Sequence, residues 1–138
     1  MELKHSRLIL RVRPGSSDDL KQAVLSHWYR VLVRAAVPEL LAKWEPVLGV
    51  EADRLFVQKM KTRWGSCNPT ARSIRLNTEL AKKPAMCLEY IVVHELAHLL
   101  ERRHNERFLG LMDACMPQWR RVRDQLNRSP LAHEEWGY

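Results

Sequence analysis

The strongest constraint on the fold is a run of apolar residues with three ionisable side chains at its centre. The run extends from Val92 to Leu100, and His94, Glu95 and His98 interrupt it. A helix built from this segment has apolar residues on every side, so it belongs in the core of the protein. A carboxylate or imidazole buried there without a partner would cost about 2 kcal/mol or more. The sequence therefore predicts that something satisfies these three groups.

Their spacing is typical of a metal site. Residues four apart lie on one face of a helix, so His94 and His98 can direct two imidazoles toward one ion. Glu95 projects about 100 degrees around the helix and can reach a molecule beside that ion. Imidazole nitrogens are good zinc ligands, with bonds of about 2.0–2.1 Å. The H-E-x-x-H pattern therefore predicts a zinc site in which Glu95 need not bind the metal.

A catalytic zinc usually has three protein ligands, and His104 is the predicted third. In a straight helix His104 would lie about 9 Å along the axis from His98, too far to share an ion. The chain must therefore turn before His104, with Arg103 or Asn105 in a less common backbone conformation. Glu101 is the alternative ligand, but three ligands along one straight helix cannot readily surround an ion.

Three further side chains are candidates for the site, and each has a plainer interpretation. Cys67 is an alternative metal ligand, but it flanks a predicted turn and is more simply a packing residue. Tyr90 lies one turn before His94 and is a possible donor to a developing oxyanion, although core packing is favoured. Asp113 is a candidate for orienting a ligand histidine through its second ring nitrogen.

The rest of the chain predicts a small sheet among helices, an α+β fold. Helical spacing runs from Ser17, a plausible cap, to about Trp44, and Pro38 begins a second helical segment. Strand-like alternation marks residues 54–60 and 73–77, and the turn residues between them predict an antiparallel pair. A short strand is predicted over residues 8–12, and further helices over 108–115, 118–126 and a segment that opens near Pro84 and contains the motif.

Composition fits one ordinary domain. The 138 residues, 46% of them hydrophobic, predict a single domain over residues 1–138 with its core at about 17–128. The formal net charge of +7 permits attraction to nucleotides, nucleic acid or acidic surfaces. No segment approaches the roughly 18 apolar residues of a membrane span, and the amino terminus lacks the apolar region of a secretion signal.

The cysteines indicate the compartment. Cys67, Cys87 and Cys115 form an odd set without C-x-x-C spacing, so a disulfide framework is not expected. Reduced thiols are typical of the cytoplasm, which is therefore the predicted location.

Three segments together resemble the YgjP-like metallopeptidase family, which is related to the SprT-like and WLM zincins. They are MKTRWGSC (60–67), IRLNTEL (74–80) and YIVVHELAHLLERRHNERF (90–108). The resemblance covers roughly residues 55–126. It implies a zincin-like α+β domain whose helices pack on a small antiparallel sheet beside the H-E-x-x-H helix. It also implies that His94, His98 and His104 bind zinc and that Glu95 is the general base.

The function implied by this resemblance is cleavage of peptide bonds by zinc-activated water. Zincins pair extended substrates with an edge strand, and Ser73–Asn77 is the best candidate in this sequence. Two alternatives use the same metal site: a nucleoside triphosphate pyrophosphatase, an activity attributed to a member of the family, and a DNA-associated protease like the SprT-like relatives. A purely structural zinc module is disfavoured because Glu95 would then be unnecessary.

Overall fold

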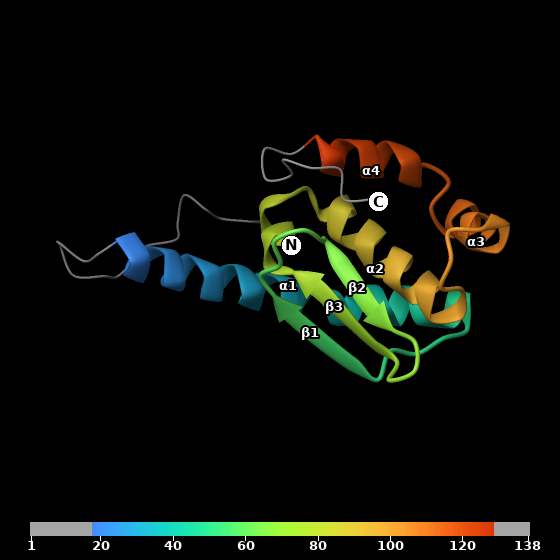
Figure 1. Ribbon diagram of the computed structural model, residues 1–138, viewed down its shortest axis with the longest axis horizontal. Helices are drawn as coiled ribbons and strands as arrows, with labels where there is room; N and C mark the ends of the chain where they lie inside the picture. The colour runs from blue at the N-terminus through green and yellow to red at the C-terminus, as the bar shows by residue number, and fades with distance from the viewer. Residues whose placement is uncertain (1–17, 129–138) are drawn as a thin grey trace.

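The computed structural model describes residues 18–128, which form helices packed with a three-stranded sheet that lies at one side of the molecule (Figure 1). The helices are α1 (Asp18–Leu48), the 3₁₀ helix η2 (Thr78–Lys82), α2 (Ala85–Leu100), α3 (Glu106–Cys115) and α4 (Trp119–Asn127). The strands are β1 (Arg54–Gln58), β2 (Gly65–Asn68) and β3 (Ser73–Asn77). The predicted α+β class is confirmed, and the predicted helices lie within a few residues of the observed ones.

Some expectations concern residues outside the described range. The strand over residues 8–12 and the cap at Ser17 lie there, and the single domain over 1–138 stays a prediction. Within residues 18–128, no helix is long and apolar enough to cross a membrane.

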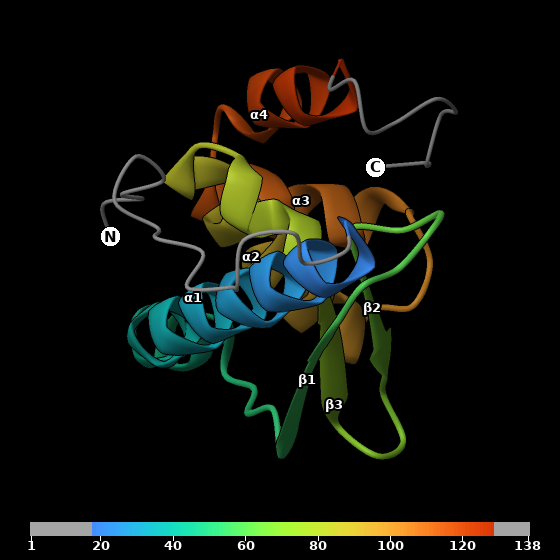
Figure 2. The same cartoon turned by 90° about the vertical axis from the view of Figure 1, so that its left-hand side faces the viewer.

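Helix α2 lies at the centre of the molecule. Seen from two directions, it runs between α4 on one side and α1 with the sheet on the other (Figures 1 and 2). Every residue from Tyr90 to His98 is buried, including the three ionisable ones. The prediction that this helix belongs to the core is confirmed, and the neighbouring elements are arranged around it.

Helix α1 is continuous, so the predicted second segment beginning at Pro38 is wrong. Proline removes a backbone hydrogen bond and normally kinks or ends a helix. Here Pro38 is exposed and the helix continues to Leu48 with Pro46 also inside it. The buried residues of α1, Val33, Val37 and Trp44, lie on both sides of Pro38. Tertiary packing of this stretch against η2 and α2 therefore outweighs the local helix-breaking tendency.

The sheet is mixed, and the predicted antiparallel pairing of residues 54–60 with 73–77 is wrong. The strand order is β1-β3-β2, with β3 parallel to β1 and antiparallel to β2. Residues 65–68, predicted to be part of a turn, instead form a strand at one edge. β3 is therefore the central strand, and Ser73–Asn77 cannot be the edge that pairs with a substrate.

A single buried asparagine fixes the crossover between β1 and β2. Asn77, at the end of β3, donates from Nδ2 to the carbonyls of Met60 (2.9 Å) and Arg63 (2.7 Å). Its Oδ1 accepts from the backbone N–H of Glu79 at 3.0 Å and so caps η2. With its side-chain donors and its acceptor all engaged, Asn77 holds residues 59–64 across the end of the sheet and leads the chain into β2.

Candidate metal centre

Three imidazoles converge at the end of α2. The ring nitrogens of His94, His98 and His104 that could hold a metal all lie within 4.8 Å of one another. The Nε2 atoms of His98 and His104 are 2.9 Å apart. The structure thus brings together the three histidines singled out in the sequence, although His104 is six residues from His98.

His104 can reach the other two imidazoles because α2 ends before this residue. The helix ends at Leu100, and Glu101 has an extended backbone with φ −141° and ψ 112°. The predicted turn before His104 is therefore confirmed. The expected unusual conformation is wrong, because Arg72 is the only non-glycine residue between 18 and 128 with a positive φ. After the turn, Asn105 caps α3 by accepting a hydrogen bond from the backbone N–H of Phe108 at 3.1 Å.

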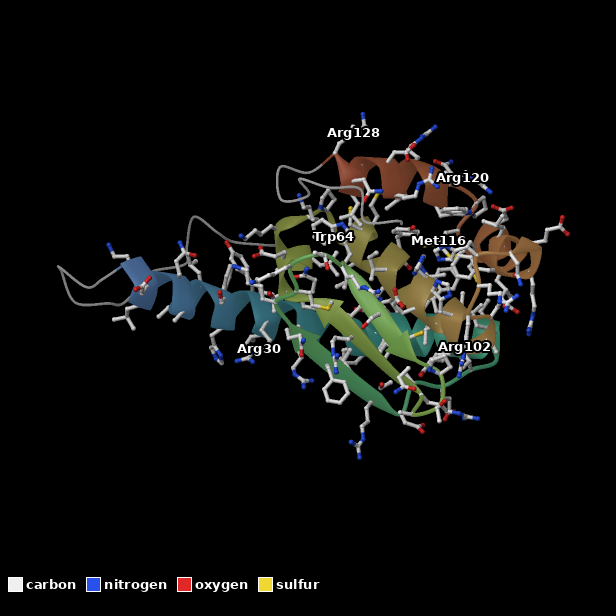
Figure 3. The ribbon with its side chains drawn as sticks, viewed as in Figure 1. Arg30, Trp64, Arg102, Met116, Arg120 and Arg128 are labelled. Carbon is white, nitrogen blue, oxygen red and sulfur yellow. The ribbon has the colours of Figure 1, made fainter. Side chains whose placement is uncertain are left out.

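The end of α2 is also tied to the sheet. Arg102 donates a long hydrogen bond of 3.4 Å to the hydroxyl of Thr70, in the turn between β2 and β3. Figure 3 shows Arg102 at this end of α2, beside that turn. The contact joins the segment that carries His104 to the turn that follows β2.

Two of the imidazoles have their tautomers set by an acceptor. The Nδ1–H of His98 donates to the carbonyl of Glu101 at 2.9 Å, which leaves Nε2 free to bind a metal. The Nδ1–H of His94 donates to Oε2 of Glu95, also at 2.9 Å. Burial lowers the pKa of His98, and the nearby His94 lowers it further. Desolvation likewise lowers the pKa of His104, so both rings favour the neutral form that binds metals.

Phe108 packs against all three imidazoles. Its ring stacks on His98 with centroids 4.3 Å apart, and it lies 4.9 Å from His104 and 5.2 Å from His94. Because Phe108 is only 2% exposed, this contact anchors the site from α3. In the sequence, Phe108 is the last residue of the segment 90–108 that resembles the family. Its position four residues after His104, in the first turn of α3, was the signal for this role.

Glu95 is the acidic group nearest this cluster. Glu95 is only 2% exposed, and its side chain lies between the imidazole of His94 and the face of β2. By contrast, the carboxylate of Glu101 accepts from the backbone N–H of Arg103 and pairs with Arg107 at 3.6 Å. Glu101 therefore contributes its carbonyl to the imidazole cluster, and its side chain lies with the arginines.

The other candidates occupy different places. Tyr90 is fully buried, stacks on Trp119 and meets the edge of His94 with centroids 5.8 Å apart, which agrees with the packing interpretation. Asp113 accepts hydrogen bonds from Trp119 and Arg120, both at 2.8 Å, so its proposed role in orienting a ligand histidine is wrong. The carbonyl of Glu101 occupies that position for His98.

The three imidazoles fit a zinc ion. Two nitrogens each about 2.0–2.1 Å from a tetrahedral ion lie about 3.3 Å apart. The observed spread, from 2.9 Å for one pair to within 4.8 Å for all, brackets that value. Three imidazole nitrogen donors with no thiolate are typical of catalytic zinc sites, which keep one position open, rather than of structural ones.

The fold and these residues define a metallopeptidase domain, and comparison with known proteins identifies its family. The sequence model of the YgjP-like metallopeptidase domain matches residues 1–129. The protein therefore belongs to the YgjP-like metallopeptidase family and is a hydrolase. A search of curated proteins found no match.

Solved structures agree with this fold. The chain is similar to the metallopeptidase zymogen abylysin of Pyrococcus abyssi, with a TM-score of 0.62 and 21% identity, over 67% of this chain and 92% of that one. It is also similar to the metallopeptidase zymogen jannalysin of Methanocaldococcus jannaschii, with a TM-score of 0.58 and 17% identity, over 67% and 94% of the two chains. At these identities, the two structures establish the fold alone.

Proposed function

We propose that the protein is a zinc metallopeptidase in which His94, His98 and His104 bind the ion and Glu95 is the general base. The observation that carries this proposal is the convergence of three imidazoles within 4.8 Å beside one buried carboxylate. A structural zinc site would need no such carboxylate. The resemblance to the family implies the same roles for these residues, and this support does not depend on the distances between the imidazoles.

When bound, a zinc ion polarises a carbonyl and lowers the pKa of a coordinated water toward about 7. The protein's own residues supply the rest of the reaction. The carboxylate of Glu95 accepts the proton of the attacking water and returns it to the nitrogen of the leaving amine. The Glu101 carbonyl holds His98 in one tautomer, and Phe108 excludes solvent from one side of the three rings.

The sheet supplies a path for an extended peptide. β2 pairs with β3 on one side and is an edge of the described sheet, and it packs on α2 next to Glu95. Main-chain hydrogen bonds to such an edge bind extended peptides without regard to most side chains. We propose that β2, rather than the central β3, pairs with the substrate.

The metal and the substrate class can be tested together. Purified protein should contain about one zinc per chain by elemental analysis. It should cleave fluorescein-labelled casein, and a chelator should abolish that cleavage. The same samples should be given nucleoside triphosphates and a protein crosslinked to DNA. If only triphosphates were hydrolysed, and a chelator stopped this hydrolysis, the protein would be a pyrophosphatase and not a peptidase. If only the protein crosslinked to DNA were cleaved, it would be a DNA-associated protease.

The proposed role of Glu95 separates chemistry from metal binding. Glu95→Gln keeps nearly the same shape but removes the basic carboxylate, so hydrolysis should fall by about 100-fold or more. Zinc content should not change, because the three imidazoles remain. Glu51→Gln, at an exposed glutamate, is the matched control and should behave like the parent. Loss of zinc from Glu95→Gln would make Glu95 a ligand, and full activity with zinc retained would exclude it as the base.

A further inference from the structure

Strand β2 approaches α2 unusually closely at Glu95. A Cβ atom added to Gly65 would lie 2.7 Å from Cγ2 of Ile91 and 3.2 Å from Cγ of Glu95. The first distance is too short for any side chain, so only glycine allows this approach. Residues two apart on a strand face the same side, so the side chain of Cys67 is directed toward α2 as well.

The thiol of Cys67 lies beside the carboxylate of Glu95, within reach of a hydrogen bond to it. Burial raises the pKa of Cys67 to about 12, and the charge and hydrogen bond of Glu95 contribute to the increase. The thiol is therefore protonated at neutral pH and acts as the donor. Cys67 is not part of a disulfide.

The Glu95 carboxylate is thus held by two different elements. From its own helix, the Nδ1–H of His94 donates to Oε2 at 2.9 Å. From the sheet, the protonated thiol of Cys67 faces the same carboxylate and can serve as a second donor. A glutamate side chain has several freely rotating bonds, and ordering them costs conformational entropy. Two donors on rigid elements reduce that freedom before any substrate binds.

We propose that Cys67 is a positioning residue that holds the Glu95 carboxylate in the orientation in which it accepts a proton. This inference rests on the proposed function of Glu95 as the general base. It assigns the thiol no contact with metal or substrate. Its chemical requirement is a short side chain with one hydrogen-bond donor at this place on β2, which serine also provides and alanine does not.

The contact itself can be tested without any measurement of hydrolysis. Zinc-loaded protein is treated with iodoacetamide, and the alkylation rates of Cys67 and Cys115 are followed by peptide mass spectrometry. In Glu95→Gln the rate at Cys67 should rise by about tenfold or more, because the neighbouring charge no longer opposes thiolate formation. Cys115, which is also partly buried, is the internal control and should not change. An unchanged rate at Cys67 would overturn the proposal.

The effect on catalysis is tested with two variants of Cys67, assayed on labelled casein, or on a nucleoside triphosphate if only that is hydrolysed. Cys67→Ala should lower kcat by about tenfold, the usual worth of a hydrogen bond to a charged group, with KM and zinc content unchanged. Cys67→Ser should recover most of that loss. Cys115→Ala is the matched control and should keep the parent kcat. Equal losses in the alanine and serine variants, or a change confined to KM, would overturn the positioning role.

A double variant shows whether Cys67 acts through Glu95. In the Glu95→Gln background, adding Cys67→Ala should cause no further loss, because the group it orients is already gone. An additional tenfold loss there would mean that Cys67 acts by another route. If Glu95→Gln alone is fully active, the proposed function fails, and the alkylation experiment still decides whether thiol and carboxylate are in contact.

Discussion

The two halves of the metal centre differ in how their imidazoles are held. His94 and His98 project from the part of α2 in which every residue from Tyr90 to His98 is buried, so the core itself fixes their position. His104 is exposed and lies in the five residues between α2 and α3, where Asn105 and Phe108 determine the path of the chain. The position of His94 and His98 therefore depends on the packing of the core, whereas the position of His104 depends on the local path of the chain. Replacing the first pair should disturb the core, whereas replacing His104 should disturb only the site.

The largest expected effect is loss of metal on removing one imidazole from either half. Removing even an outer-sphere partner costs about 10–100-fold in metal affinity, so His98→Ala and His104→Ala should each weaken zinc binding by more than about 100-fold. The two variants should differ in the stability of the metal-free protein. His98→Ala should lose about 1–3 kcal/mol, and His104→Ala less than about 0.5 kcal/mol.

Zinc affinity by competition with a chelating dye and urea unfolding of metal-free protein would measure both quantities. His27→Ala, at an exposed histidine of α1, is the control and should bind zinc normally. If His104→Ala retains the parent affinity, the third ligand is another group, and Glu101→Gln becomes the variant to examine. Equal stability losses for the two alanine variants would remove the distinction between the halves.

The next effect concerns Asn77, which fixes the crossover between β1 and β2. Asn77→Asp keeps an acceptor for the N–H of Glu79, but it turns a carboxylate toward two backbone carbonyls that lose their donor. The protein should be destabilised by about 3 kcal/mol or more, measured by urea unfolding. Asn68→Asp is the matched control, since the exposed Asn68 uses only its acceptor, toward Thr70 and Ala71. Equal changes in both would mean that the crossover does not depend on Asn77.

The smallest effect concerns the exposed half and its helix cap. Asn105→Ala removes the acceptor for the N–H of Phe108 and should cost about 1 kcal/mol of stability. Because His104 precedes this cap directly, zinc affinity should also fall, by less than in His104→Ala. Asn105→Ser restores a capping oxygen and should recover both properties. An alanine variant with unchanged zinc affinity would show that Phe108 alone positions this segment.

Sequence reasoning succeeded where local spacing and burial act together. The pattern from Val92 to Leu100 predicted a core helix with two imidazoles on one face, because only the helical repeat was needed. The end of that helix before His104 followed from the length of a helical turn. The sheet was not predictable in this way, because residues 65–68 contain glycine and asparagine, and their strand character comes from pairing with β3. The prediction of a new helical segment at Pro38 failed for the same reason, since long-range packing outweighed the local tendency of proline to break a helix.

The sequence alone therefore determined the helix, the three histidines and the acidic residue between them, because a helical period converts spacing directly into direction. Tertiary structure decided which elements surround them. It made β3 central, placed β2 against Glu95, and brought Phe108 onto all three rings. Pairing of distant strands depends on where the whole chain returns, and no local repeat records that. For this reason the contact between Cys67 and Glu95, separated by 28 residues (95 − 67), is visible only in the folded protein.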